Sequence, residues 1–523
     1  MGTIKFGRDK MGKRTKKAMS AILIASLCVA FMFPLNVNAG EVPNTGEVGV
    51  GSAGEKLSAD YNYGFSLGEE FGDLYKTVDT TFWEKTNGIW ERTALIEKAE
   101  KHIEMLKEYY PQRLERLSGL SDALGIPLVD IVAITMFLPS LTRMGCTTTA
   151  LAPPATNDGQ IYTSWNMDVL DPLLLIGIPS RIPLPANLVL FVQDIPGYNK
   201  CVVLGIPLIF GIDLLNDKGL TYVANAIGMT DGSDEGLTDF ELNNLAMETC
   251  SSVDDVVALY ERTPKYSCAG YSAGIFMNMN TIWTDPSGNM VGIEHSGHHM
   301  VTHYGKDHIL ASTNHHQYLD RSLSGSPTPL EQKAIAGSYA RLGRAWELLE
   351  DNCGEIDLDF MKSFTADHER NYTLLREFGD YREDKPVDDD TICCHYWNMP
   401  GYLMNRDIGS ATDCFLAGTT IFSIIMQPDE FTIWFCPGRP CTFPYIPLYF
   451  ADLLGVEGPS YTSGVGPEPV TQIANGLLGL ENGLASLLTS IPFATEIKSS
   501  ISICIITGMK VLIPILEKII PVR

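Results

Sequence analysis

Between residues 146 and 316 the chain consists of short runs rich in β-branched and aromatic residues, separated by turn sequences such as NDG, NDKG and DPSG. Such runs between turns are typical of strands joined by tight connections. Helical stretches at 238–261 and 330–352 interrupt them, and further strands are expected at 412–426 and 430–436. This order of elements predicts an α+β domain in which two sheets are covered by helices.

The segment before this region predicts helices. Apolar residues recur at helical spacing until Pro111 interrupts them, and the run IPLVDIVAITMFLPSL predicts a further helix. Residues 40–60 are rich in glycine and small residues and are interpreted as a linker. The apolar positions that carry the helical period are Leu95, Ile96, Ala99, Ile103 and Leu106.

The N-terminus has the layout of a secretory signal peptide. Basic residues between Lys5 and Lys17 precede an apolar run at 21–33, and small or short residues lead to Gly40. We therefore expect residues 1–39 to be a signal peptide, cut after Ala39, and the protein to be secreted or displayed at the cell surface. The apolar run is too short to span a membrane as a helix. An uncut N-terminal anchor, which would still export the domain, stays the alternative.

Composition restricts the partners and the redox chemistry. The formal net charge of −25 argues against nucleic acid as a partner, because nucleic-acid binding needs a basic surface. The chain has 12 cysteines, which an exported protein can pair, but no pair of zinc-type C-x-x-C motifs. The sequence FCPGRPC at 435–441 could close a short disulfide loop, and free thiols are an equal alternative.

The last segment, residues 456–523, is apolar and helix-like. It is interpreted as a C-terminal extension that packs on the domain or makes contact with a membrane surface.

Cys146 follows Gly145 directly and opens a predicted strand. A thiol attacks carbonyl carbons well but needs a base to take its proton. If the 145/146 bond is cut, Cys146 gains an α-amino group that titrates at about 7.7–8.0 and can act as that base. Gly145 has no Cβ and allows the thiol to approach its own peptide carbonyl. These residues predict autoprocessing at Gly145–Cys146 by an N-to-S acyl shift and hydrolysis.

The stretch GCTTTALAPPATNDGQIYTSWNMD, residues 145–168, resembles the nucleophile region of the N-terminal-nucleophile (Ntn) linear amide C–N hydrolases. This group includes penicillin acyltransferase (peptidase family C45) and the choloylglycine hydrolases. Five further segments match the family in order: NDKGLTYVANAIGMT, TDPSGNMVGIEHS, ILASTNHH, SYARLGRAWELLED and FTIWFCPGRPCTFPY. The resemblance implies a four-layer αββα sandwich of two mainly antiparallel sheets. It also implies a helical propeptide within 40–145 and a catalytic domain at 146–455.

The resemblance implies a role for each matching residue. Cys146 is the expected nucleophile, and Asp168 is expected to orient and charge-balance its α-ammonium group. Asn314 is expected to donate a hydrogen bond to the oxyanion of the tetrahedral intermediate. Asn225 is expected to be a second donor or a substrate contact. Arg341 is expected to favour the thiolate.

Structural roles are the alternatives at each of these positions. They are a buried core cysteine, a turn aspartate, capping asparagines and a surface arginine, with Arg344 as the rival of Arg341. Glu294 and Ser338 match the family as supporting residues. One departure is Trp165, which stands where the bile acid branch has an arginine, and this favours the acyltransferase branch.

The histidine-rich stretch HSGHHMVTH, residues 295–303, could suggest a metal site. However, adjacent histidines on regular structure point in different directions and no H-E-x-x-H motif occurs, so we interpret the stretch as a polar hairpin or loop.

The sequence thus predicts an exported, self-processing cysteine amidase that cleaves linear amides through an S-acyl enzyme. The expected substrate is a small-molecule amide, such as an N-acyl amino acid or acyl peptide, and no cofactor or metal is expected. Acyl transfer to an amine is the first alternative. A non-catalytic exported binding protein on the same fold is the second, because fold alone does not establish activity.

Overall fold

The structure is a computed structural model. It describes residues 58–87, 90–138, 144–169, 189–267, 278–385, 387, 389–394, 419–436 and 438–459. The expected signal peptide, most of the linker, the strand residues 412–418 and almost all of the C-terminal extension lie outside these residues.

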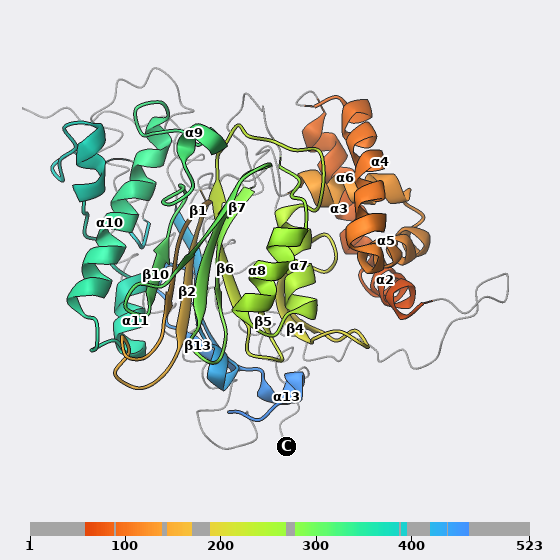
Figure 1. Ribbon diagram of the computed structural model, residues 1–523. Coiled ribbons are helices and arrows are strands. Elements are labelled where there is room, and N and C mark those ends of the chain that lie inside the picture. Colours follow the sequence, from red (N-terminus) through yellow and green to blue (C-terminus); the bar gives the residue numbers. More distant parts are fainter. Residues whose placement is uncertain are drawn as a thin grey trace, which may run out of the picture.

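Two antiparallel sheets form the centre of the molecule (Figure 1). The six-stranded sheet has the order β10-β1-β2-β11-β12-β13, and the seven-stranded sheet has the order β3-β4-β5-β6-β7-β8-β9. The first sheet contains β10 (Ile309–Ser312), β1 (Met144–Leu151), β2 (Tyr162–Val169), β11 (Thr419–Gln427), β12 (Thr432–Cys436) and β13 (Ile446–Tyr449). The second contains β3 (Val189–Gln193), β4 (Cys201–Ile206), β5 (Phe210–Asn216), β6 (Thr221–Ile227), β7 (Asn278–Thr284), β8 (Met290–His295) and β9 (Met300–Tyr304).

Helices cover the outer face of each sheet. Figure 1 shows α10 (Ala336–Asp351) and α11 (Leu358–Thr365) on one side, and α7 (Asp239–Thr249) and α8 (Val253–Arg262) on the other. The inner faces carry apolar residues that are buried between the sheets, as expected for two sheets that pack face to face. The expected αββα sandwich of two antiparallel sheets is therefore confirmed.

The helical segment before β1 lies against the α7 side of the sandwich (Figure 1). It consists of α2 (Ala59–Glu70), α3 (Gly72–Thr86), α4 (Arg92–Tyr109), α5 (Pro111–Leu124) and α6 (Leu128–Phe137). Pro111 is the first residue of α5, where its missing N–H costs nothing, so the predicted break is a junction between two helices.

Buried charges join this segment to α7. Arg116 on α5 is fully buried and forms ion pairs with Asp60, at 2.7 Å, and with Glu248 on α7. His102 on α4 lies 2.7 Å from Glu241, a second acidic residue of α7. A buried charge without its partner destabilises the folded state. These ion pairs therefore favour one specific position of the helical segment on α7.

Two predictions are refined by the structure. The helical stretch at 238–261 is two helices, because Cys250 leaves the helical conformation. The Ser252 side chain then caps α8 by accepting a hydrogen bond from the N–H of Asp255. Within the series of short runs at 146–316, the run KCVVLGIPLIFGIDLLND contains two of the strands, β4 and β5, which form a hairpin.

The histidine-rich stretch is the hairpin of β8 and β9, as expected. His295 pairs with Asp239 at 2.6 Å, His298 pairs with Asp231 at 2.8 Å, and the ring of His303 stacks on Tyr318. Each of these three histidines therefore has a different partner.

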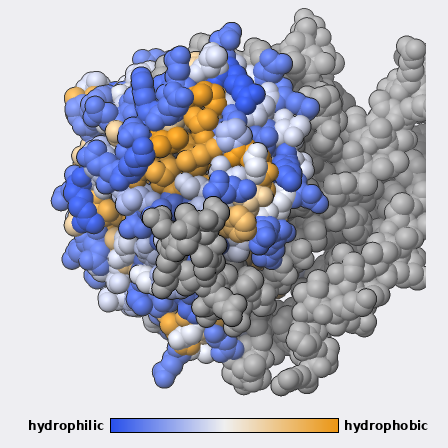
Figure 2. All heavy atoms as spheres, turned by 90° about the vertical axis from the view of Figure 1, so that its right-hand side faces the viewer, coloured by the Kyte–Doolittle hydropathy of each residue, from blue (hydrophilic) through white to orange (hydrophobic). Residues whose placement is uncertain are grey.

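Among the described residues, no single helix is long and apolar enough to cross a membrane, and α5 and α6 reach that length only together, across a bend of 119°. Figure 2 shows the face on the α2–α6 side of the molecule, where a patch of apolar side chains is surrounded by hydrophilic ones.

Candidate active site

The pairing of β1 with β2 brings the first site residues together. In the register of this pair, Gly145 lies opposite Asp168 and Cys146 lies opposite Met167. Side chains alternate between the two faces of a strand, so Cys146 and Thr147 face different layers. Cys146 faces the space between the sheets, whereas the Thr147 hydroxyl faces Arg341 of α10.

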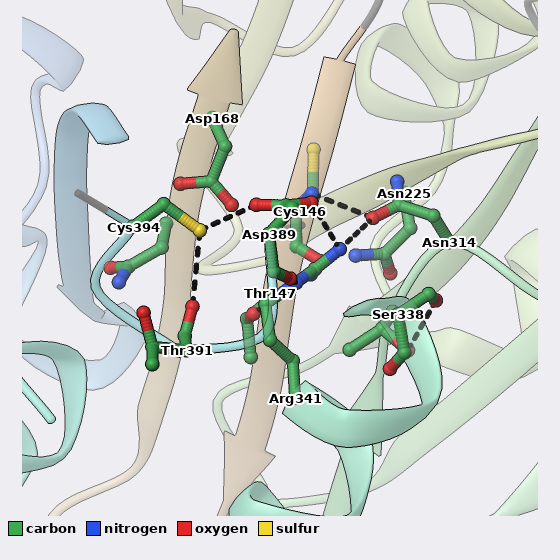
Figure 3. A network of polar contacts seen from close by, with 12 residues as sticks. Cys146, Thr147, Asp168, Asn225, Asn314, Ser338, Arg341, Asp389, Thr391 and Cys394 are labelled. Carbon is green, nitrogen blue, oxygen red and sulfur yellow. Dashed lines mark hydrogen bonds and ion pairs between the residues drawn. The ribbon is translucent and has the colours of Figure 1, made fainter. Parts of the chain in front are cut away.

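Cys146 is buried, and its backbone is held on both sides (Figure 3). Its N–H donates a hydrogen bond of 2.8 Å to Oδ1 of Asn314, and its carbonyl oxygen accepts one from Arg341. Burial raises the pKa of the Cys146 thiol to about 12, and the charge of Arg341 lowers it by less than burial raises it. The thiol is therefore protonated at neutral pH while the 145/146 bond is intact.

Asn314 lies in the loop after β10, with its side chain fully engaged at the site. Its Oδ1 accepts hydrogen bonds from Cys146 and from Arg341, and its Nδ2 donates to the carbonyl of Ala226 at 3.0 Å. Two donors at one oxygen determine which way the amide points. In the uncut chain Asn314 thus binds the nitrogen of the 145/146 peptide bond, and its role as an oxyanion donor stays a prediction.

The two supporting residues hold the Asn314 loop. Glu294 accepts hydrogen bonds of 2.8–2.9 Å from the backbone N–H groups of residues 317, 318 and 319. Ser338 on α10 binds His315 at 2.7 Å and Thr313 at 3.0 Å. Both residues flanking Asn314 are therefore anchored, which makes Glu294 and Ser338 positioning residues.

Arg341 is the centre of the polar network in Figure 3. This buried guanidinium binds the Cys146 carbonyl, the Thr147 hydroxyl at 3.1 Å and Asn314 at 2.8 Å. It also binds both the backbone carbonyl and the carboxylate of Asp389 at 2.9 Å. Arg344, its rival in the sequence, instead pairs with Asp367 at 2.9 Å, away from Cys146.

Asp168 and Asp389 form a buried acidic pair beside Gly145. Oδ1 of Asp168 accepts a hydrogen bond of 2.6 Å from Thr420, and its Oδ2 has no hydrogen-bond partner among the described residues. Burial, followed by repulsion from Asp389, raises the pKa of Asp168 well above its usual range. In the uncut chain the carboxyl group of Asp168 therefore favours its protonated, neutral form, and its role in balancing the α-ammonium charge stays a prediction.

Gly145 is required by the close approach of this pair. A Cβ at position 145 would lie 2.6 Å from Oδ2 of Asp389 and 3.3 Å from Cβ of Asp168. Any other residue at position 145 therefore requires the Asp389 side chain to move.

Asn225 on β6 joins the two sheets behind Cys146. Its Oδ1 accepts a hydrogen bond of 2.7 Å from Thr148, and its Nδ2 donates to the carbonyl of Ser312 at 3.4 Å. Asn225 thus lies in the neighbourhood that the sequence predicts. Both of these hydrogen bonds are to strands β1 and β10, and its role in catalysis stays a prediction.

The thiol of Cys146 borders a small apolar cavity between the sheets. The lining comes from β2, β5, β6, β7 and α7, and the departure from the bile acid pattern, Trp165, is part of it. The lining residues besides Cys146 are Trp165, Met167, Ile212, Tyr222, Ala224, Ala226, Phe240 and Met279.

Three site residues were not predicted from the sequence: Asp389, Thr420 and Cys394. The thiol of Cys394 hydrogen-bonds to Asp389 and also contacts the carbonyl of Thr391 at 3.1 Å. Asp389 lies in a run of three aspartates, and its φ of 59° is a left-handed conformation that aspartate tolerates. No spacing motif marks these positions, because they meet Cys146 only through the fold.

A family of known proteins matches part of the chain. The family model for acyl-coenzyme A:6-aminopenicillanic acid acyl-transferase matches residues 186–411. The matched range includes Asn225, Asn314, Arg341 and Asp389 but begins after Cys146 and Asp168. This match confirms the resemblance to the penicillin acyltransferase-like family.

Solved structures of two enzymes are also similar to part of the chain. A variant of conjugated bile acid hydrolase from Clostridium perfringens is 13% identical, with a TM-score of 0.35, and the alignment covers 60% of this chain and 95% of that one. Penicillin V acylase from Agrobacterium tumefaciens is 11% identical, with a TM-score of 0.32, over 60% of this chain and 88% of that one. No curated protein sequence matches the chain.

The two antiparallel sheets and the family match point to the same class of protein. The chain is therefore similar, over residues 186–411, to a family of acyltransferases, and its two antiparallel sheets agree with the Ntn-type fold that the sequence predicts.

Proposed function

We propose that this protein is an exported cysteine amidase that cuts itself between Gly145 and Cys146 and then hydrolyses linear amides. The observation that carries the proposal is the environment of Cys146. The nitrogen of its peptide bond is bound by Asn314, its carbonyl is bound by Arg341, and its thiol borders an apolar cavity. The nucleophile and the nitrogen that becomes its base thus belong to one residue that is held rigidly.

Self-cleavage proceeds from the protonated thiol of the uncut chain. The sulfur of Cys146 attacks the carbonyl carbon of Gly145, the C–N bond breaks, and the thiol proton goes to the departing nitrogen. Water then hydrolyses the thioester, which leaves a carboxylate on Gly145 and a free thiol on Cys146. Asp168 and Asp389 lie beside this bond, and their raised pKa values allow a proton to be relayed between them and the nitrogen.

Cleavage changes the chemistry of Cys146. The new α-amino group can take the thiol proton, and the free oxygen of Asp168 can bind the resulting ammonium. The sulfur then attacks the substrate amide, the amine leaves with a proton, and water releases the acyl group from the S-acyl enzyme.

The apolar lining of the cavity, to which β2 contributes Trp165 and Met167, favours an apolar acyl group. N-acyl amino acids and acyl peptides are the substrate classes that we propose. Acyl transfer to an amine is the second candidate, and the description of the matching family favours it. Export by residues 1–39 and contact of residues 456–523 with a membrane surface belong to the same proposal.

The test is to express the full chain with Cys146→Ala, with Cys146→Ser and with Cys353→Ala, an exposed cysteine that serves as the control. Each protein is assayed on N-acyl amino acids, bile acid conjugates and penicillins, with and without an added amine. We expect Cys146→Ala to abolish turnover and Cys353→Ala to retain it, while Cys146→Ser retains partial self-cleavage but little turnover. Products that carry the added amine would identify acyl transfer. Full activity of Cys146→Ala would contradict the proposal.

A further inference from the structure

A second cluster of reactive side chains lies outside the catalytic network. One ligand atom each of His368, Cys393 and Cys441 lies within 4.8 Å of the other two. The three residues come from separate segments: His368 follows α11, Cys393 lies in the segment 389–394, and Cys441 lies between β12 and β13. None of the catalytic steps described above uses these side chains.

The protein backbone holds this cluster in place. The N–H of Cys393 donates a 3.0 Å hydrogen bond to the carbonyl of Asp367, the residue next to His368. The loop of Cys441 is closed by two hydrogen bonds of 2.9 Å from residues 442 and 443 to the carbonyl of Arg439. Cys393 is fully buried, whereas His368 and Cys441 are exposed, so the cluster opens to solvent on one side.

We propose that His368, Cys393 and Cys441 bind a divalent cation of the zinc type. One imidazole nitrogen and two thiolates are ligands that Zn²⁺ prefers, and three protein ligands leave a fourth position for water. On binding, the two thiols release their protons to solvent and form two metal–sulfur bonds, and no oxidation takes place.

The position of this site gives it a structural role. Cys393 is adjacent to Cys394, whose thiol contacts Asp389, and Asp389 is bound by Arg341 beside Cys146. The backbone of the same segment is tied to β2, because Asn166 donates a 2.8 Å hydrogen bond to the carbonyl of Ile392. A metal at Cys393 therefore fastens the segment that carries Asp389 to the loop before β13. The proposal does not depend on the chemistry of Cys146.

The experiment compares the full chain with Cys441→Ser and His368→Gln, both at exposed positions, and with Cys353→Ser as the control at an exposed cysteine outside the cluster. Each protein is reduced, incubated with Zn²⁺ and desalted, and its zinc is measured by elemental analysis alongside its melting temperature. We expect one zinc per chain and a raised melting temperature in the wild type and in Cys353→Ser, and loss of both in Cys441→Ser. His368→Gln should hold zinc more weakly.

Two results would overturn the proposal. One is equal zinc retention by the wild type and by Cys441→Ser. The other is a protein as isolated that lacks zinc, is lighter by two hydrogen atoms and yields a peptide linking Cys393 to Cys441, which would identify the pair as a disulfide. Neither result depends on whether the chain cleaves itself, so failure of this site and failure of the proposed function are distinguishable.

Discussion

The backbone N–H of Cys146 donates a hydrogen bond of 2.8 Å to the side-chain oxygen of Asn314, although the two residues are 168 positions apart in the chain. The same side chain has an N–H group that the family resemblance assigns to the oxyanion. Asn314 thus offers an acceptor to the peptide nitrogen before cleavage and a donor that could serve turnover afterwards. These two roles can be separated by substitution.

Asn314→Asp keeps the acceptor oxygen and removes the donor. We expect this variant to cleave itself but to lose roughly 10²–10³-fold in amide turnover, the usual effect of removing one oxyanion donor. Asn314→Ala removes both groups and should slow cleavage as well. The measurements are the rate at which the two fragments appear and the kcat of the processed protein. Equal turnover by the wild type and Asn314→Asp would exclude a donor role.

Gly145→Ala should block or strongly slow self-cleavage, because the new Cβ would lie 2.6 Å from Oδ2 of Asp389. The matched control is Gly72→Ala at the start of α3, where a Cβ would meet only Leu124, at 3.8 Å. Processing is followed on denaturing gels over time. Wild-type processing by Gly145→Ala would show that the close approach of Asp389 is not needed.

The buried Arg116 should keep the two fragments together after cleavage. It pairs with Asp60 inside the small fragment and with Glu248 on the large one. Arg116→Ala leaves Glu248 buried without this partner, a change that typically costs about 3–5 kcal/mol. We expect the wild-type fragments to co-elute in gel filtration and the variant fragments to separate or aggregate. Arg92→Ala, which removes an ion pair within the small fragment, is the control.

Stability should depend on pH through Asp213. Burial raises the pKa of Asp213 to about 7, and Glu248 adds to the effect. The folded state therefore binds a proton that the unfolded state, with a pKa of about 3.9, releases. The stabilisation is complete below about pH 4 and is lost as the pH rises through about 7.

Asp213→Asn should flatten this pH dependence of the unfolding free energy between about pH 4 and 7. Urea unfolding at several pH values measures it. Asp194→Asn, at a half-exposed surface ion pair with Lys200, should leave the slope unchanged. If the unfolding free energy of Asp213→Asn depends on pH as that of the wild type does, groups other than Asp213 cause the pH dependence.

The sequence pattern predicted the fold and part of the candidate site. The two-sheet architecture follows from local signals, since alternating strands and turn sequences specify hairpins such as β7–β8. The identity of the site arginine did not follow from the helical pattern alone. Arg341 and Arg344 are one turn apart on α10, and only the partners around them, Asp389 and Asp367, separate them.

Asp389, Cys394 and the cluster at Cys393 escaped prediction because their chemistry arises from contacts between distant segments. The acidic pair forms only when β2 and the segment 389–394 meet at Gly145, and Asp389 lies in no local motif that marks it as a site residue. The raised pKa of the Cys146 thiol likewise results from burial between two sheets, and a short stretch of sequence does not reveal that burial.

The N-terminal residue of the large fragment tests the central claim most directly. The full chain is expressed, purified and analysed by intact mass and N-terminal sequencing, with amide turnover measured on the same sample. We predict two chains, with the larger beginning at Cys146 and the smaller ending at Gly145. A preparation that turns over amides while its 145/146 bond is intact would contradict the account.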